Sequence, residues 1–189
     1  MQGTELVIKA LKDIGVRYVF GYTGGAIMPI FDEMEKQKIF KFIMSRHEQG
    51  AAFMAQGISR ASISTADPQV GVCMATSGPG AMNLVTGVAD AGMDSVPLIA
   101  ITGQVPSSVI ATDAFQESDV VGVMLPLVKQ AYMPLDVNKI EETIHEATFL
   151  ARSGRGGPVV VDIPKDIQIQ PTDEGYRFDP DTYEPDLPG

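Results

Sequence analysis

The sequence is poor in cysteine, histidine and tryptophan: its 189 residues include one Cys, two His and no Trp. The single thiol, Cys73, excludes an internal disulfide and is typical of a reducing compartment. Because Cys73 lies in an apolar run, we expect a small core residue there rather than a reactive group. No group of His, Cys and carboxylate residues has metal-ligand spacing, and we expect no metal site formed by this chain alone.

Long apolar runs and an excess of positive charge are also missing. No apolar stretch approaches the roughly 18 residues that cross a bilayer, so no membrane span is expected. The chain has 14 Lys and Arg against 24 Asp and Glu, and its net charge of −10 disfavours a nucleic-acid partner. It starts with an amphipathic helical pattern rather than a signal peptide, and we expect a cytoplasmic protein, or a plastid one if a transit peptide was removed.

The sequence does contain a regular alternation of apolar runs and helical patterns, separated by turns rich in glycine. The expected strands are 16–20, 41–44, 70–75, 97–101, 129–133 and 158–163. The expected helices are 4–14, 26–35, 48–62, 81–93, 118–127 and 137–152. This order predicts an α/β fold, with a doubly wound parallel sheet of about six strands and helices on both faces.

The composition changes after the last expected strand. Residues 171–189 contain six acidic residues, one basic residue and four prolines. Such a segment cannot fill a hydrophobic core. We predict one domain over residues 1–166 and an acidic, proline-rich linker over 167–189, leading toward a second domain outside this chain.

Glu48 is the strongest candidate for chemistry. It stands where the expected strand 41–44 passes into a helix rich in small residues, a place where water is scarce. A buried carboxylate needs a partner or shifts its pKa. Taken alone, Glu48 is more simply read as a structural acid at a helix N-terminus.

Three other loops are expected beside Glu48, at the edge where parallel strands end and ligands bind. Gly24 and Gly25 would let a ligand approach the backbone, because neither has a Cβ. The turn 76–80 offers backbone N–H groups at a helix start, but its spacing fits neither a dinucleotide-binding motif nor a P-loop, and a tight packing turn explains it equally well. The loop 103–117 is long and polar. His47 is interpreted as a surface or packing residue, and His145 as a solvated one.

Four motifs in this order resemble the pyrimidine-binding domain of enzymes that use thiamine diphosphate (ThDP). They are Gly21-Tyr22-Thr23-Gly24-Gly25-Ala26, Arg46-His47-Glu48-Gln49-Gly50-Ala51, Thr76-Ser77-Gly78-Pro79-Gly80-Ala81 and Thr102-Gly103-Gln104-Val105-Pro106. Residues 112–117 and 153–166 narrow the resemblance to the catalytic subunit of acetohydroxyacid synthase (acetolactate synthase). Departures from that family's pattern are Thr23 in place of proline, Gly156 within the usual Arg-Pro-Gly-Pro, and the divergent residues 120–133.

The resemblance implies that the whole protein joins pyruvate to a second 2-ketoacid, pyruvate or 2-ketobutyrate, with loss of CO₂, in branched-chain amino acid biosynthesis. It implies that Glu48 hydrogen-bonds N1′ of the cofactor's aminopyrimidine and so promotes loss of the thiazolium C2 proton. The other residues that it places at the cofactor are Tyr22, Gly24, Gly25, Ser95 and Gln116, with Arg155 at FAD. Those that it places at the substrate are Gln104, Phe115 and Lys165.

The chain lacks the Gly-Asp-Gly motif with a downstream Asn that holds Mg²⁺ and the diphosphate in this family. The resemblance therefore implies Mg²⁺ and most of the FAD site outside this chain, an inactive isolated domain, and a homodimer or higher homo-oligomer with a regulatory subunit. Two alternatives stay open. One is another ThDP-dependent acyltransferase, oxidase or decarboxylase of 2-ketoacids. The other is a non-catalytic α/β binding module, which would have no need of Glu48.

Overall fold

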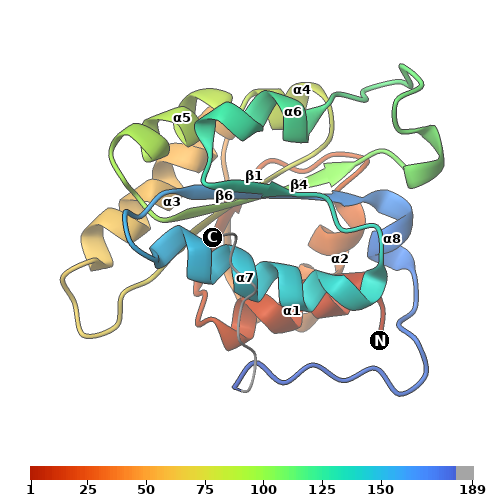
Figure 1. The fold of residues 1–189 in the computed structure, drawn as a ribbon, viewed down its shortest axis with the longest axis horizontal. Helices are drawn as coiled ribbons and strands as arrows, with labels where there is room; N and C mark the ends of the chain where they lie inside the picture. The colour runs from red at the N-terminus through yellow and green to blue at the C-terminus, as the bar shows by residue number, and fades with distance from the viewer. Residues whose placement is uncertain (182–189) are drawn as a thin grey trace.

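A six-stranded, all-parallel sheet forms the centre of the computed structural model, which describes residues 1–181 (Figure 1). The strand order is β2-β1-β3-β4-β6-β5. The strands are β1 (Tyr18–Gly21), β2 (Lys41–Met44), β3 (Gly71–Ala75), β4 (Leu98–Gln104), β5 (Gln130–Tyr132) and β6 (Pro158–Pro164). This confirms the predicted sheet, and β4 continues beyond its predicted end at residue 101.

Helices cover both faces of the sheet (Figure 1). One layer contains α1 (Gly3–Asp13), α2 (Met28–Gln37), α7 (Ile140–Arg152) and α8 (Lys165–Ile169). The other contains α3 (Glu48–Ser62), α4 (Pro79–Met82), α5 (Val85–Met93) and α6 (Val120–Met124). Three short 3₁₀ segments complete the described elements: η1 (Ser107–Val109), η2 (Leu125–Leu127) and η3 (Val137–Lys139). The doubly wound architecture with two helical layers is therefore confirmed.

The strands are apolar on both faces, because each face is covered by a helical layer. In β3, Val72 and Met74 contact the layer of α1 and α2, whereas Cys73 and Ala75 contact the layer of α3 and α5. Cys73 is fully buried, as expected for a core residue. Helix α3 lies close to the sheet, since it contacts the sheet through alanines and a Cβ on Gly71 of β3 would collide with the backbone of Ala55.

The predicted helix 81–93 is wrong as a single element, because the structure divides it into α4 and α5. Leu84 N donates to Ala81 O at 3.0 Å, a bond of 3₁₀ type that interrupts the α-helical ladder. Similarly, the predicted helix 118–127 divides into α6 and η2, where Pro126 lacks the N–H that an α-helix would need.

The chain after β6 contacts the domain again. Helix α8 crosses the predicted boundary at residue 166, and its Ile167 and Gln168 are buried. Pro171 forms an isolated antiparallel bridge with Gln2. The division into domain and linker stays a prediction, and residues 182–189 of that linker lie outside the described residues. Within residues 1–181, every helix is too short or too polar to cross a membrane.

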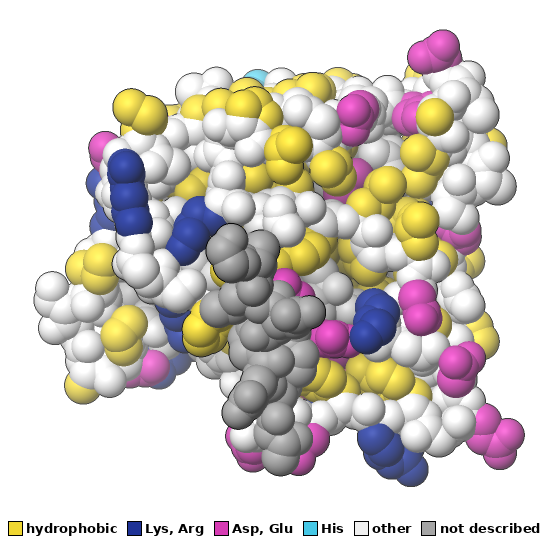
Figure 2. Space-filling view, viewed as in Figure 1, with side chains coloured by type: hydrophobic (Ala, Val, Ile, Leu, Met, Phe, Trp, Pro, Cys, Tyr) yellow, Lys and Arg dark blue, Asp and Glu magenta, His cyan; other side chains and the backbone are white. Residues whose placement is uncertain are grey.

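The two edges of the sheet differ at the surface. Figure 2 shows Lys and Arg side chains gathered at the left of this face and acidic and apolar side chains prominent at the right, where the loop after β4 lies (Figure 1). Lys129 and Arg155 precede β5 and β6, so they belong to the edge at which the strands begin. The carboxyl edge of the sheet carries the candidate site.

Candidate cofactor site at the carboxyl edge of the sheet

The site lies where the winding of the sheet reverses direction. Strand β1 pairs with β2 on one side and with β3 on the other, and all three are parallel. The helices that follow β1 and β3 lie on opposite faces of the sheet, and ligands of open parallel sheets usually bind at such a switch point. Glu48 begins α3 at this edge of the sheet, directly after the connection from β2.

Local sequence fixes the position of Glu48. His47 is the N-cap of α3, and its Nδ1 accepts a hydrogen bond from Gln49 N at 3.1 Å. Capping starts the helix at Glu48, whose negative charge interacts favourably with the helix N-terminus. The predicted strand end and helix start are both confirmed here.

Glu48 is buried and has a protein partner. The residue is 8% exposed, and its Oε2 accepts a hydrogen bond from Asn83 Nδ2 at 2.9 Å. Asn83 is the one hydrogen-bond donor to this carboxylate among residues 1–181. Sequence analysis missed Asn83. The available signal was an asparagine, a poor helix former, inside an expected helix; it lies at the break between α4 and α5.

Two glycines allow the turns around Glu48 to approach closely. A Cβ on Gly80 would lie 3.3 Å from Glu48 Oε1 and 2.7 Å from Thr76 Cγ2, and a Cβ on Gly24 would lie 2.6 Å from Thr76 Cγ2. Thr76 also ties the turns together, because its Oγ1 accepts a hydrogen bond from Ala26 N at 3.1 Å. Beside Gly25, by contrast, there is nothing within 4 Å of a Cβ position. The predicted close backbone approach therefore exists at Gly24, and open space exists beside Gly25.

The loop between β4 and α6 is held from inside by Glu117. The Glu117 carboxylate accepts hydrogen bonds from the backbone N–H groups of Ala111, Thr112 and Ala114, the last two at 3.2 and 3.1 Å. These backbone bonds lower the pKa of Glu117, the bond from Ala111 most of all. At the tip, the Phe115 side chain is 88% exposed.

This loop contacts the turn that carries Gly80. A Cβ on Gly78 would lie 2.5 Å from Gln116 O, and Gly78 has a φ of +55° that disfavours other residues. The loop and the turn 76–80 thus touch through their backbones. Phe115 and Gln116, both predicted from the resemblance, are accordingly carried on the same edge of the sheet as Glu48.

Gln104, which the resemblance places at the substrate, has its side chain inside the protein. It is 2% exposed. Its Nε2 donates to Asp162 Oδ2 at 2.8 Å and to Ser118 O at 2.9 Å, and its Oε1 accepts from Val105 N at 2.8 Å. All of these bonds are internal, and the contact with substrate stays a prediction.

Asp162 is a fully buried carboxylate beside Gln104. Thr102 Oγ1 donates to its Oδ1 at 2.6 Å, and Gln104 Nε2 to its Oδ2. Burial raises the pKa of Asp162 to about 6, although the hydrogen bonds from Thr102 and Gln104 act in the opposite direction. Sequence analysis did not single out this residue, because Asp162 becomes a neighbour of Thr102 only through the pairing of β4 with β6.

Two further predicted residues lie at the carboxyl edge. Tyr22 directly follows β1; its backbone N donates to Met74 O at 3.3 Å, and the residue is 43% exposed. Lys165 directly follows β6 as the first residue of α8.

Ser95 and Arg155 lie at the opposite edge, where β4 and β6 begin. Arg155 Nε donates to Ser95 Oγ at 2.7 Å. The guanidinium also donates to Met93 O at 3.1 Å and to Gly92 O at 3.4 Å, at the C-terminus of α5. The structure therefore brings these two residues to each other and not to Glu48.

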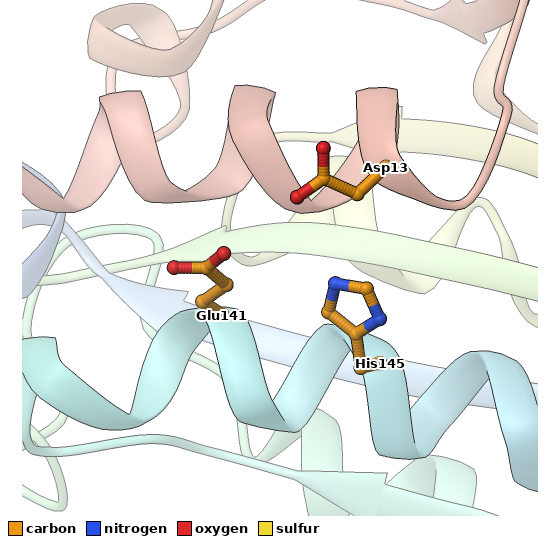
Figure 3. Close-up of side chains that lie close together, drawn as sticks. All are labelled: Asp13, Glu141 and His145. Carbon is orange, nitrogen blue, oxygen red and sulfur yellow. The ribbon is translucent and has the colours of Figure 1, made fainter. Parts of the chain in front are cut away.

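A separate group of possible metal ligands joins α1 to α7. Asp13, Glu141 and His145 bring one ligand atom each to within 4.8 Å of one another (Figure 3). Sequence analysis missed this cluster because its members come from distant helices. Lys9 Nζ already bonds to Glu141 and, at 3.3 Å, to Asp13, so an ammonium supplies the positive charge between the carboxylates. A metal ion would have to displace it.

His145 itself differs from the expectation of a solvated residue. It is partly buried, and its Nε2 is enclosed without a hydrogen-bond partner among residues 1–181. Burial lowers the pKa of His145, which favours the neutral ring. Besides the carboxylates of Asp13 and Glu141, its neighbours include Phe178, whose ring centroid lies 5.2 Å from that of His145.

Fold and site together define an α/β domain that has a buried carboxylate and glycine-containing turns at the switch point of its sheet. The family described as "Thiamine pyrophosphate enzyme, N-terminal TPP binding domain" matches residues 1–123. The chain belongs to this family, whose cofactor is the ThDP predicted from the motifs.

Relatives in plants and bacteria show which members of this family the chain resembles. The chain is 52% identical over 169 residues to "Acetolactate synthase 2, chloroplastic" of Nicotiana tabacum, covering 89% of this chain and 25% of the relative. It is 47% identical over 166 residues to "Acetolactate synthase isozyme 1 large subunit" of Escherichia coli K12, covering 88% and 29%. The chain thus spans about a quarter of the length of the curated relatives it matches. The predicted resemblance to acetolactate synthases is confirmed.

Proposed function

We propose that this chain supplies the aminopyrimidine-binding half of the ThDP site in an acetolactate synthase. The observation that carries the proposal is the arrangement of Glu48: its carboxylate is buried at the switch point, bonded to Asn83 through Oε2, and next to a glycine through Oε1. The names of the similar proteins support the same assignment.

The residues present fit the cofactor's aminopyrimidine. A flat ring that is bound through a ring nitrogen needs a carboxylate within hydrogen-bond reach and backbone without side chains beside it. Glu48 Oε1 has no donor among residues 1–181, Gly80 lets its turn approach that oxygen, and open space lies beside Gly25 within the described residues. When bound, ThDP supplies carbanion chemistry at its thiazolium C2.

The residues of this chain would hold the aminopyrimidine ring and promote transfer of the C2 proton of the cofactor. Glu48 would hydrogen-bond N1′ of the aminopyrimidine and stabilise the tautomer that can take up the C2 proton. Asn83 would fix the direction of the carboxylate by holding Oε2. Tyr22, Gly24, Gly25 and Gln116 would lie on the cofactor side, while Phe115 and Lys165 would face the substrate side from the same edge.

The remainder of the cofactor set would be bound mainly outside this chain. Mg²⁺ and the diphosphate need oxygen ligands of the kind provided by the missing Gly-Asp-Gly motif. Arg155 would contact FAD at the opposite edge, next to Ser95. The completed enzyme would join pyruvate to a second 2-ketoacid with loss of CO₂, as a homodimer or higher oligomer with a regulatory subunit, in the cytoplasm or a plastid.

A product assay on the enzyme completed by its diphosphate-binding domain tests this function. With pyruvate, ThDP and Mg²⁺, we expect acetolactate, and with added 2-ketobutyrate the mixed acetohydroxy acid. Omission of ThDP is the control. Acetaldehyde or an acyl phosphate as the main product would instead indicate a decarboxylase, oxidase or acyltransferase that shares Glu48.

A further inference from the structure

One side chain holds both ends of the loop after β4. Gln104 is the last residue of β4, and the loop returns to the domain at Ser118, just before α6. The Gln104 amide accepts from Val105 N, at the start of the loop, and donates to Ser118 O, at its end, at 2.8 and 2.9 Å. The contact is shielded from water, since Gln104 is 2% exposed.

Asp162 sets the direction of that amide. An ionised carboxylate can accept hydrogen bonds but cannot donate them. The NH₂ group of Gln104 must therefore face Asp162 Oδ2, which lies 2.8 Å from Nε2. The same NH₂ group then reaches Ser118 O, and the carbonyl oxygen is left for Val105 N. Thr102 holds the other carboxylate oxygen, at 2.6 Å. The network leaves the amide one orientation that satisfies every partner.

The loop needs such restraint, because its backbone is unfavourable. Ala111, Asp113 and Gln116 have φ values of 64°, 56° and 57°, although none is a glycine. Steric crowding of the Cβ disfavours this left-handed region for residues other than glycine, so the surroundings must hold the conformation. Glu117 supplies bonds within the loop, and the Gln104 amide joins the loop to the sheet.

The restrained loop contacts the turn beside Glu48. A Cβ on Gly78 would lie 2.5 Å from Gln116 O, so the two backbones touch. Gly80 of the same turn approaches Glu48 Oε1. A shift of the loop would therefore move Phe115 and Gln116 relative to Glu48.

We propose that Gln104 is a positioning residue, which closes the loop 105–118 at both ends in the orientation set by Asp162 and so places Phe115 and Gln116 at the active site. The proposal rests on the proposed function only in this last step. Gln104 acts from inside the protein and does not touch the substrate.

Hydrogen–deuterium exchange of this 189-residue chain, read by mass spectrometry over residues 109–117, tests the structural step. In Gln104→Leu we expect exchange of these amides to quicken by on the order of ten- to thirtyfold, because two ordinary hydrogen bonds no longer oppose loop opening. In Asp162→Ala exchange should quicken as well, because the orientation of the Gln104 amide is no longer set. Asp162→Asn keeps an acceptor for Gln104 and should stay near wild type. Gln56→Leu is the matched control: it removes a buried amide that donates to Gly87 O at 2.8 Å and should leave the loop unchanged.

If Gln104→Leu fails to fold because Asp162 loses a donor, the double variant Gln104→Leu/Asp162→Asn removes the unpaired charge and gives the same readout. Exchange over residues 109–117 that stays at the wild-type rate in folded Gln104→Leu, or in the folded double variant, would overturn the proposal.

Kinetics of the completed enzyme test the functional step. Gln104→Leu and Asp162→Ala should lower kcat/KM for pyruvate together, with Asp162→Asn restoring most of it. A loss in Gln104→Leu alone, with Asp162→Ala unaffected, would mean that Gln104 touches the substrate and would also overturn the proposal. If the wild-type enzyme makes no acetolactate, the proposed function fails, while the exchange experiment still decides whether Gln104 holds the loop.

Discussion

Asn83 Nδ2 lies 2.9 Å from Glu48 Oε2, and this contact holds one oxygen of the acid while Oε1 has no donor among residues 1–181. Without Asn83, a carboxylate that is 8% exposed would lack a neutral donor from the chain, at a considerable cost in free energy. With it, Oε2 is held, and Oε1 faces the glycine-containing turn. We regard the pair as the centre of the site.

Glu48→Gln should abolish most catalysis in the completed enzyme while leaving ThDP bound. Glutamine keeps the shape of the side chain but removes the charge that favours the reactive tautomer. A positioned acid or base is worth about 10²–10⁴-fold, so we expect a loss of that size in kcat. The measurement is deuterium exchange at C2 of bound ThDP, followed by NMR after an acid quench. Exchange as fast as in wild type would make Glu48 a structural helix acid.

Asn83→Ala should have a smaller effect on the same measurement. The acid remains, but its Oε2 loses its donor and its direction is no longer fixed. We expect C2 exchange to slow by roughly tenfold, the equivalent of one ordinary hydrogen bond. Asn138→Ala is the control, because the Asn138 side chain bonds to Asp136 and Asp173 and, within residues 1–181, not to Glu48. Equal rates in Asn83→Ala and wild type would show that Glu48 needs no positioning.

Two glycine-to-alanine substitutions should change the free energy of unfolding in opposite directions. At Gly80 an added methyl group would lie 2.7 Å from Thr76 Cγ2 and 3.3 Å from Glu48 Oε1, so Gly80→Ala should disturb the site and lower the free energy of unfolding by about 1–3 kcal/mol. At Gly57, in the middle of α3, nothing lies within 4 Å. Gly57→Ala should therefore raise the free energy of unfolding by about 0.5–1 kcal/mol, through helix propensity. Urea titrations compare both with wild type, and a stabilising Gly80→Ala would contradict the close approach.

The sequence predicted the sheet and the place of Glu48 because local signals were sufficient there. Residues 41–44 and 48–62 have clear strand and helix patterns, and both elements match the structure. Parallel order then follows from the alternation of strands and helices. Glu48 is where it was expected because its position depends only on these two neighbouring elements.

The polar contacts could not be predicted, because each depends on pairing between distant segments. Thr102 and Gln104 look like the start of a loop, since they interrupt an apolar run. They are buried strand residues because the register of β4 and β6 places Thr102 opposite Asp162. Likewise, Asn83 reaches Glu48 only because the chain turns between α4 and α5.

This chain alone should bind ThDP weakly. Glu48 and its turns offer contacts to one ring, whereas the charged diphosphate would have no Mg²⁺ site within this chain. In calorimetric titrations we expect similar, weak affinities for ThDP and for thiamine, with little effect of Mg²⁺. Tight binding of ThDP that requires Mg²⁺ would mean that the chain holds a diphosphate site of its own.

The pH dependence of the free energy of unfolding should reveal the raised pKa of Asp162. Burial raises the pKa of this carboxyl to about 6, against an ordinary value of 3.8 that applies to the unfolded chain. Below the lower pKa value, Asp162 is protonated in both the folded and the unfolded protein, and its titration does not lower the free energy of unfolding. Between the two values the unfolded chain releases the proton while the folded protein retains it, so stability falls as the pH rises through this window.

Asp162→Asn does not titrate and is the comparison for this window. Relative to it, the wild-type protein should gain about 2 kcal/mol in free energy of unfolding between pH 7 and pH 4.5, because its stability rises by about 1.36 kcal/mol per pH unit over the roughly 1.5 units below the folded pKa of about 6. Urea unfolding of both proteins at the two pH values gives the measurement, and the other titrating groups cancel in the difference. If the difference between the two proteins is the same at both pH values, Asp162 is ionised in the folded protein throughout. The carboxylate that orients Gln104 would then be stabilised by more than the hydrogen bonds from Thr102 and Gln104.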